Sequence, residues 1–127
     1  MGVVATASPS GKPEAALVGI AVSDSGELIF DTPAGARKLT NIERNDRVAV
    51  VVGWNDGISV QLEGRARVVN DDERLRYGRL YASQFPGSRV SHPCFAVAVV
   101  TPNWVRRYDA TSDPAQCEHA NWLPGPA

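Results

Sequence analysis

The stretch FDTPAGARKLTNIERNDRVAVVVGW, residues 30–54, decides the fold, because its pattern changes from strand to helix and back again. From Ala36 onward, Leu39 and Ile42 are spaced for one face of a helix that ends at Arg44, and polar residues occupy its other sides. The segment RVAVVVGW, residues 47–54, is then a continuous apolar run typical of a strand. One short helix therefore interrupts a chain that is otherwise rich in strands.

The same stretch places two adjacent cations, Arg37 and Lys38, at the start of this helix. The first turn of a helix carries partial positive charge from its unpaired backbone N–H groups, so cations there are unfavourable unless an anion lies between them. Judged from the local sequence alone, the pair is more typical of a solvated helix face. The alternative is that the pair binds an anion.

The segments on either side predict strands joined by tight turns. GVVATA (2–7), EAALVGIAV (14–22) and ELIFDT (27–32) are separated by turns rich in Ser, Pro and Gly, which predicts a three-stranded meander. After the turn NDG (55–57), ISVQLEGRARVV (58–69) alternates as a long half-buried strand does.

A second helix and two strands are expected in the C-terminal half. Asn70, followed three residues later by Glu73, predicts a helix start, and DDERLRYGRLYASQF (71–85) carries apolar residues near helical spacing. FAVAVV (95–100) predicts a buried strand, and WVRRYDA (104–110) predicts a short final one. These elements favour an antiparallel barrel or sandwich of the α+β kind, followed by an irregular tail.

Composition restricts the kind of protein. The chain has 127 residues and a formal net charge of -1, which predicts one domain without a basic surface for nucleic acid. Its apolar runs are far shorter than the roughly 20 residues of a membrane helix, and the N-terminus lacks the pattern of a secretory signal. We therefore expect a cytoplasmic protein that does not span a membrane.

The histidines and cysteines do not predict a metal site. Cys94 lies two residues after His92, and Cys117 lies two residues before His119, but structural zinc usually takes its close cysteine pairs at wider spacing. We interpret these four residues as incidental. The sequence also offers no Ser-His-Asp or Cys-His arrangement, so no catalytic residue is predicted.

Four segments occur in an order and spacing that are specific when taken together: GVVATASPSGKPEAALVGIAV (2–22), FDT (30–32) followed by RKLTNIERNDRVAVVV (37–52), EGRARVV (63–69) and FAVAVVTPNWVRRY (95–108). In these segments the chain resembles the pyridoxamine 5′-phosphate oxidase-like family of FMN-binding split barrels. The resemblance implies an α+β, mainly β fold, in which an antiparallel split barrel of six or seven strands with two short helices spans residues 1–110. Residues 111–127 are then an irregular tail.

The resemblance also implies what the anion is. In this family the strand–loop–helix segment that ends in an Arg-Lys pair binds FMN, so the matching residues here are Asp31, Thr32, Arg37 and Lys38. The last three are expected to hold the FMN phosphate. The chemistry agrees, because a phosphate takes charge-assisted hydrogen bonds from a guanidinium and an ammonium while it meets the N–H groups of a helix start.

Further contacts with the flavin ring are implied by position. The backbone of Ala16, Leu17, Val18 and Gly19 is expected beside the isoalloxazine ring, where small side chains would let a flat ring approach. Ser59 stands where the oxidases of the family carry a glutamine that contacts FMN. Gln61, on the same strand face, is an alternative to it.

A partner subunit is also implied. Tyr108 stands where an aromatic residue of the partner packs beside the flavin, and its neighbours Trp104 and Arg107 are close enough in sequence to share that role. Ordinary packing is the more typical role for Trp104. A homodimer with flavin at the interface is therefore expected.

The chain departs from the family at the substrate site. Ala16 and Ala21 stand where the oxidases that act on pyridoxamine phosphate carry an arginine and a lysine. The tail also lacks their basic Arg-Leu-His motif. Oxidation of pyridoxamine phosphate is therefore not expected.

Three functions remain open. The first is an FMN-dependent oxidoreductase that passes hydride or electrons to an unknown small molecule, with the flavin supplying the chemistry. The second is a deazaflavin-dependent reductase on the same fold, whose acidic tail would need a basic groove from Arg44, Arg47, Arg65 and Arg67. The third is a flavin- or haem-binding protein without turnover.

Overall fold

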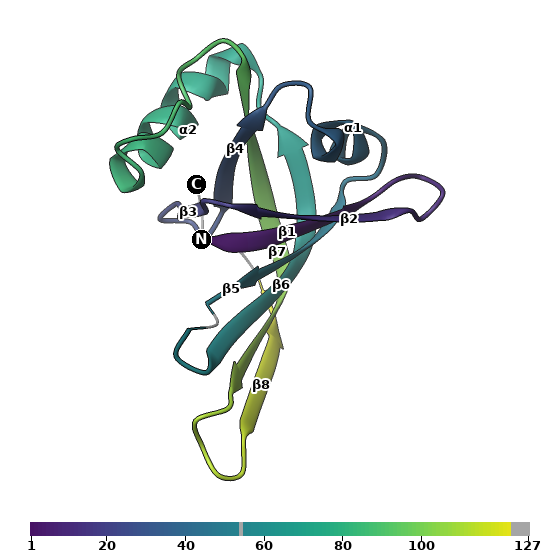
Figure 1. Cartoon of the computed structure of the whole chain (residues 1–127), viewed down its shortest axis with the longest axis vertical. Coiled ribbons are helices and arrows are strands. Elements are labelled where there is room, and N and C mark those ends of the chain that lie inside the picture. Colours follow the sequence, from purple (N-terminus) through teal and green to yellow (C-terminus); the bar gives the residue numbers. More distant parts are fainter. Residues whose placement is uncertain (54, 123–127) are drawn as a thin grey trace.

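A computed structural model describes residues 1–53 and 55–122, and Figure 1 shows a curled antiparallel sheet with one helix at each of two margins. The elements, in chain order, are β1 (Gly2–Ala7), β2 (Pro13–Val18), β3 (Ala21–Val22), β4 (Leu28–Pro33), α1 (Arg37–Arg44), β5 (Arg47–Val52), β6 (Ile58–Val68), α2 (Asp71–Gln84), β7 (Phe95–Asp109) and β8 (Gln116–Asn121).

The strand order creates an opening in the sheet. The order is β2-β1-β5-β6-β7-β4-β3, with β8 added to β7, and every neighbouring pair is antiparallel. β2 and β3 follow each other in the chain, yet they lie at the two ends of this order. β3 covers only Leu28 and Ile29 of β4, so residues 30–33 keep a free edge. We call the gap between this edge and the free edge of β2 the split.

Two apolar clusters pack on opposite faces of the sheet. The inner face of the barrel carries Val4, Phe30 and Leu62, whereas the other face of β4 and β7 packs against α2 through Ile29, Val97 and neighbouring residues. Because the centre of β7 is buried on both faces, its sequence is a continuous apolar run rather than an alternating one.

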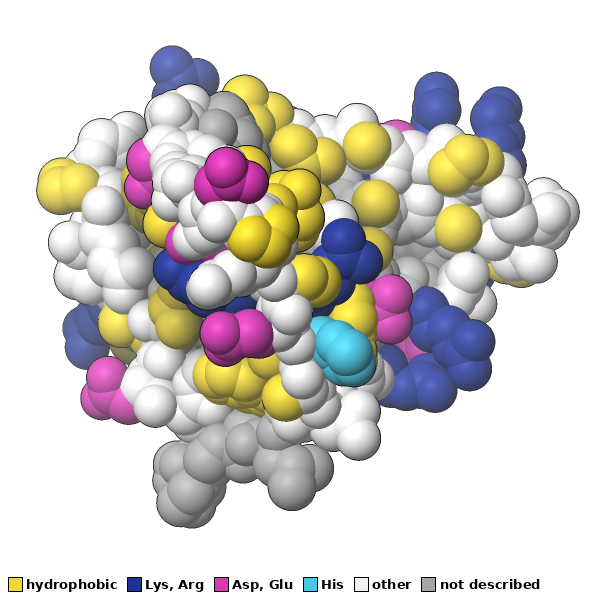
Figure 2. All heavy atoms as spheres, turned by 90° about the horizontal axis from the view of Figure 1, so that it is seen from below, with side chains coloured by type: hydrophobic (Ala, Val, Ile, Leu, Met, Phe, Trp, Pro, Cys, Tyr) yellow, Lys and Arg dark blue, Asp and Glu magenta, His cyan; other side chains and the backbone are white. Residues whose placement is uncertain are grey.

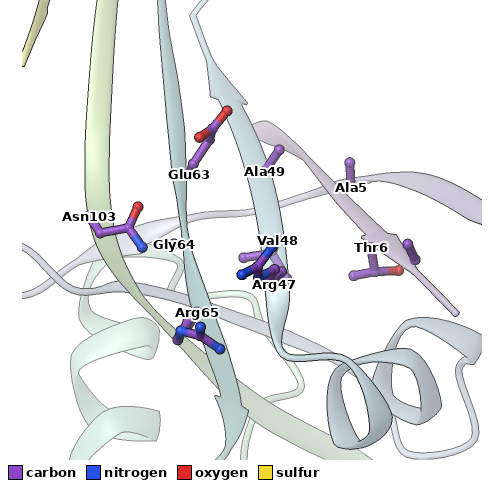
Figure 3. A pocket seen from close by; sticks show the side chains of 10 residues that line it. Ala5, Thr6, Arg47, Val48, Ala49, Glu63, Gly64, Arg65 and Asn103 are labelled. Atoms are coloured by element: carbon purple, nitrogen blue, oxygen red, sulfur yellow. The ribbon is translucent and has the colours of Figure 1, made fainter. Parts of the chain in front are cut away.

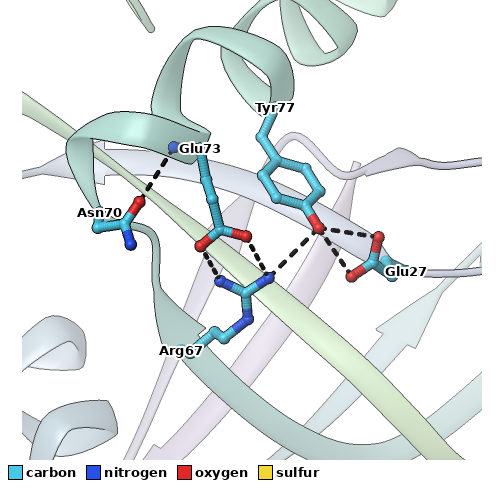
Figure 4. Close-up of polar contacts among 5 residues, drawn as sticks. All are labelled: Glu27, Arg67, Asn70, Glu73 and Tyr77. Atoms are coloured by element: carbon cyan, nitrogen blue, oxygen red, sulfur yellow. Dashed lines mark hydrogen bonds and ion pairs between the residues drawn. The ribbon is translucent and has the colours of Figure 1, made fainter. Parts of the chain in front are cut away.

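Hydrogen bonds fasten α2 to the sheet, as Figure 4 shows. The side chain of Asn70 accepts from the backbone N–H of Glu73 at 3.0 Å, which caps the helix. Glu73 also pairs with Arg67 of β6 at 2.5 Å, and this contact raises the pKa of Arg67 and lowers that of Glu73. The Tyr77 hydroxyl donates to the carboxylate of Glu27 at 3.0 Å. These contacts hold α2 over one face of β4 and β7.

α2 also covers one sheet edge. The side chain of Gln84 accepts from the N–H of Val22 at 3.2 Å and donates to the carbonyl of the same residue at 3.1 Å. An exposed strand edge is otherwise a place where another chain can pair. The edge of β3 is therefore closed, while the split stays open.

Most of the predicted architecture is confirmed: the fold is a mainly β, antiparallel split barrel with two helices. The strand count of six or seven is too low, because the described residues form eight strands. The segment 14–22 divides into β2 and β3 at Gly19 and Ile20, where the chain crosses from one end of the sheet to the other. Trp54 and residues 123–127 of the predicted elements lie outside the described residues.

Two predictions for the C-terminal region are also wrong. The segments 95–100 and 104–110 form one strand, β7, because a bulge opposite Glu63 and Gly64 absorbs Asn103 and lets the strand continue past Pro102. The tail is not irregular throughout, since β8 pairs with β7. All six residues of β8 are exposed, so backbone pairing rather than an apolar pattern forms this strand.

Candidate functional site

The split ends at the start of α1, where an anion would find unpaired donors. Ala36 precedes the helix and provides no side-chain cap, and no acidic residue lies in the first turn. Arg37 and Lys38 are the first two helical residues. The helix start therefore offers backbone N–H groups and two cations at one place.

Lys38 and Thr32 are held together. The ammonium of Lys38 donates a hydrogen bond to the hydroxyl of Thr32 at 2.9 Å, and Thr32 is only 2% exposed. This bond joins the end of β4 to the first turn of α1. Two of the three residues predicted to bind the phosphate thus meet at the split.

Arg37 has a different neighbour. Its Nε lies 3.7 Å from a carboxylate oxygen of Glu14 in β2, and its side chain is 68% exposed, against 21% for Glu14. That oxygen, Oε2, is buried and has no hydrogen-bond partner. Sequence reasoning missed Glu14, although its alternation with Ala16 and Val18 places it on the inner face of β2. We call Glu14, Thr32, Arg37 and Lys38 the clamp cluster.

A second polar contact lies beneath α1. The side-chain amide of Asn41 donates to the hydroxyl of Thr6 at 3.0 Å, and both residues are buried. Thr6 is directly opposite Glu14 in the β1–β2 register. This end of the barrel interior is therefore polar and hydrogen-bonded, unlike the apolar centre.

The residues expected beside the flavin ring lie on different faces. Ala16 and Val18 turn inward, whereas Leu17 turns outward and is 59% exposed. Gly19 instead lies under α2, where the Tyr81 hydroxyl donates to its carbonyl at 3.4 Å. A Cβ at Gly19 would come within 2.6 Å of the Tyr81 oxygen. Close packing of α2 is therefore a sufficient reason for this glycine.

Gly19 and Asp31 line a cavity on the α2 side of the split, of about 430 Å³, together with Tyr81, Gln84 and Phe85. Burial raises the pKa of Tyr81, and the neighbouring Asp31 carboxylate raises it further. The Tyr81 hydroxyl thus stays protonated at neutral pH and acts as a hydrogen-bond donor. Sequence reasoning missed Tyr81, Gln84 and Phe85, which lie at the end of α2 and directly after it, because their helical spacing predicted only a packed face.

Ser59, Gln61 and Tyr108 lie on the outer face of the sheet. Ser59 is directly opposite Tyr108, and Gln61 is opposite Arg106 in the β6–β7 register. Within one chain they are therefore separated by the sheet from the clamp cluster. Arg107 pairs with Asp109 at 3.8 Å. Trp104 is half-buried, with its ring centre 6.3 Å from that of His119.

The outer face also carries a cavity of about 450 Å³, shown in Figure 3. Arg47 and Arg65, two of the four arginines expected for a basic groove, are opposite each other in the β5–β6 register and both line it. Arg65 also bonds Asp46 at 2.6 Å. Seen from below, acidic, basic and apolar side chains are intermixed (Figure 2), so a binding site for an anion has to be local.

The described residues, 1–53 and 55–122, contain no group of three or more His, Cys, Asp or Glu side chains arranged to hold a metal ion. Both cysteines are exposed and unpaired with each other. Within the same part of the chain, no helix is long and apolar enough to cross a membrane.

Comparisons with known proteins point to one family. Residues 1–109 match the family model described as pyridoxamine 5′-phosphate oxidase. A pyridoxine/pyridoxamine 5′-phosphate oxidase of Rubrobacter xylanophilus is 35% identical over 89 residues, which are 69% of this chain and 40% of that protein. One from Ehrlichia ruminantium is 30% identical over 93 residues, 72% of this chain and 46% of that protein. The match thus covers less than half of each relative.

Solved structures show the same fold at low identity. A haem binding protein from Mycobacterium smegmatis superposes with a TM-score of 0.76 at 18% identity, covering 94% of this chain and 52% of its own. A pyridoxamine 5′-phosphate oxidase-related, FMN binding protein from Nostoc punctiforme gives 0.67 at 15% identity, covering 97% and 87%. General Stress Protein 26 from Bacillus anthracis gives 0.73 at 21% identity, covering 95% and 88%.

Proposed function

Because this chain belongs to the pyridoxamine 5′-phosphate oxidase family, we propose that it binds FMN at the split and serves as a flavin-dependent oxidoreductase acting on a small molecule. The observation that carries the proposal is the Lys38–Thr32 hydrogen bond at the uncapped start of α1. A hydroxyl, an ammonium and unpaired helix N–H groups are the donors that a phosphate needs.

The residues around the split fit the rest of such a ligand. The edge of β2 and residues 30–33 of β4 have backbone N–H and C=O groups that no strand pairs on that side, and the polar rim of a flavin ring can use them. The bound flavin would supply the hydride or electron transfer. The chain would orient the cofactor and leave one face accessible, which requires no catalytic acid or base.

We propose that the substrate is not pyridoxamine phosphate. Ala21, one of the two alanines at the positions of the family's basic residues, is fully buried against α2, and Ala16 is half-buried on the inner face. Neither offers a charge for a second phosphate. The two relatives named as pyridoxine/pyridoxamine 5′-phosphate oxidases are matched over only 40% and 46% of their length, so their names do not establish the substrate of this chain.

A deazaflavin is the second candidate cofactor, because Arg47 and Arg65 lie together beside one cavity, although that cavity is on the face of the sheet opposite the clamp cluster of the same chain. Haem is a third, since a protein described as haem binding shares the fold. We expect the protein purified from its host to carry flavin absorbance, and mass spectrometry of the heat-released cofactor to identify FMN. Release of a deazaflavin or of haem would contradict the FMN proposal.

Turnover distinguishes an enzyme from a carrier. The loaded protein is expected to oxidise NADH or NADPH under air at a rate that depends on the flavin. If the flavin is bound but neither donor nor any artificial acceptor changes its oxidation state, the non-catalytic alternative replaces the oxidoreductase.

We also propose a twofold dimer, formed through the outer face that carries Leu17 and Tyr108, which are 59% and 38% exposed. Tyr108 of each subunit would then close the flavin site of the other. Sedimentation velocity is expected to give twice the 13.6 kDa mass of one chain. A monomer that holds a full complement of FMN would refute the dimer.

A further inference from the structure

Glu14 introduces a negative charge into a site that otherwise favours anions. Its carboxylate lies on the inner face of β2, 21% exposed, with Oε2 3.7 Å from the Nε of Arg37. Oε2 is buried and accepts no hydrogen bond. A buried carboxylate oxygen without a hydrogen-bond donor lowers the stability of the fold, so a functional role would explain why Glu14 lies beside Arg37.

The charge of the clamp cluster follows from its members. Arg37 and Lys38 each contribute one positive charge and Glu14 one negative charge, which leaves a single net positive charge within the clamp cluster. A phosphate monoester carries roughly 1.5 to 2 negative charges at neutral pH, whereas a phosphodiester carries one. Glu14 repels each of these charges, so the doubly charged ligand is penalised more.

We propose that Glu14 tunes the charge selectivity of the clamp cluster: its carboxylate lowers the affinity for doubly charged phosphate esters more than the affinity for singly charged ones. The inference rests on the proposed phosphate site. In the absence of ligand, Glu14 holds Arg37 by charge. When a phosphate enters, Arg37 exchanges Glu14 for the ligand, and the remaining carboxylate penalises a second negative charge.

The test replaces Glu14 by a side chain of the same shape without the charge, Glu14→Gln, and uses three ligands with one ring system. Riboflavin has no phosphate, riboflavin 5′-methyl phosphate has one negative charge, and FMN has about two. The variant is expected to bind riboflavin unchanged, the methyl ester roughly threefold more tightly, and FMN roughly tenfold more tightly. The ratio of the FMN affinity to the methyl-ester affinity is therefore expected to be roughly threefold larger in the variant than in the native protein.

Glu43→Gln is the matched control. Glu43 is exposed on α1, so this variant changes the net charge of the protein by the same amount outside the clamp cluster. Its three affinities are expected to stay within about twofold of the native values. Circular dichroism and thermal unfolding establish that both variants fold.

Two results would overturn the inference. Equal gains for all three ligands in Glu14→Gln would show an effect of shape instead of charge. Weaker FMN binding would show that Glu14 positions Arg37 for the phosphate, which is the opposite role.

A measurement without flavin separates this inference from the proposed function. Inorganic phosphate and dimethyl phosphate, at pH 8 and equal ionic strength, are compared for the rise in melting temperature that each gives. The rise in melting temperature that phosphate causes is expected to be larger in Glu14→Gln than in the native protein. The rise that dimethyl phosphate causes is expected to differ little between the two proteins.

If this pattern occurs while no flavin binds, the proposed function fails and the role of Glu14 stands. If flavins bind but the gain does not depend on charge, the role of Glu14 fails and the function stands. If neither flavin nor phosphate responds, both are wrong.

Discussion

Replacing Arg37 and Lys38 together by alanine is expected to weaken FMN binding by at least about a hundredfold, because the two proposed charge-assisted contacts, of roughly 1.5–3 kcal/mol each, are lost. The substitution also leaves the buried carboxylate of Glu14 without its counter-ion, which adds repulsion toward the phosphate. Riboflavin, which has the ring but no phosphate, is expected to bind the native protein much more weakly than FMN and to be nearly indifferent to the double substitution.

The measurement is a titration of both ligands into both proteins, with circular dichroism as the control on folding. Arg44→Ala combined with Arg79→Ala is a matched control, because both residues are exposed on helices and neither belongs to the clamp cluster. Unchanged FMN affinity in the folded Arg37/Lys38 variant would mean that the pair is a solvated helix face, which is the alternative that the local sequence favours.

Gly64→Ala is expected to destabilise the fold by about 3 kcal/mol or more, a large part of the roughly 5–15 kcal/mol by which a domain is stable. A Cβ at this position would lie 2.3 Å from the carbonyl oxygen of Thr101 and 2.9 Å from the Cα of Pro102. Both are backbone atoms of β7 at the bulge, so the clash is relieved only by separating β6 from β7. This pairing is the longest in the sheet.

Urea unfolding of Gly64→Ala and Gly35→Ala provides the comparison. A Cβ at Gly35, in the loop before α1, meets nothing within 4 Å, so that variant is expected to stay within about 0.5 kcal/mol of the native protein. If Gly64→Ala is too unstable to purify, the soluble yield of Gly35→Ala under the same conditions shows that the position is responsible. Equal unfolding midpoints would contradict the close approach of the two strands.

The sequence predicts those elements whose own residues carry the signal. Leu39 and Ile42 are both buried as the helical spacing requires, and Asn70 caps α2 as its spacing to Glu73 indicates. β8 has no such signal, because it is formed by hydrogen bonds to β7 and buries no side chain. The run Thr-Pro-Asn predicts a break between two strands. In the structure a bulge in the pairing of β6 with β7 accommodates this run, and the sequence of β7 alone does not reveal that pairing.

The candidate site is predictable only in part for the same reason. Thr32 and Lys38 lie six residues apart in one segment, so a local pattern brings them together. Glu14 meets Arg37 only because β2 and α1 lie at the same end of the barrel, which no spacing in the sequence specifies. Gly19 can be identified as a close-approach position, but what approaches it in the structure is Tyr81, 62 residues further along the chain.

The strand order also constrains how the protein can be made. β4 leaves the ribosome early, but its pairing partner is β7, whose residues are synthesised near the end of the barrel sequence, and β7 is also the partner of β6 and β8. Until β7 emerges, a nascent chain can form the β1–β2, β1–β5 and β5–β6 pairings and the short β3–β4 pairing, but the long edge of β4 that pairs with β7 has no partner. Pairing strands that are far apart in the sequence requires the closure of long loops, and the entropy cost of that closure comes before any stabilising contact forms. Such pairings therefore make folding slow. The apolar residues of β4 therefore stay exposed for most of translation, and the cell's chaperones have that interval in which to bind them.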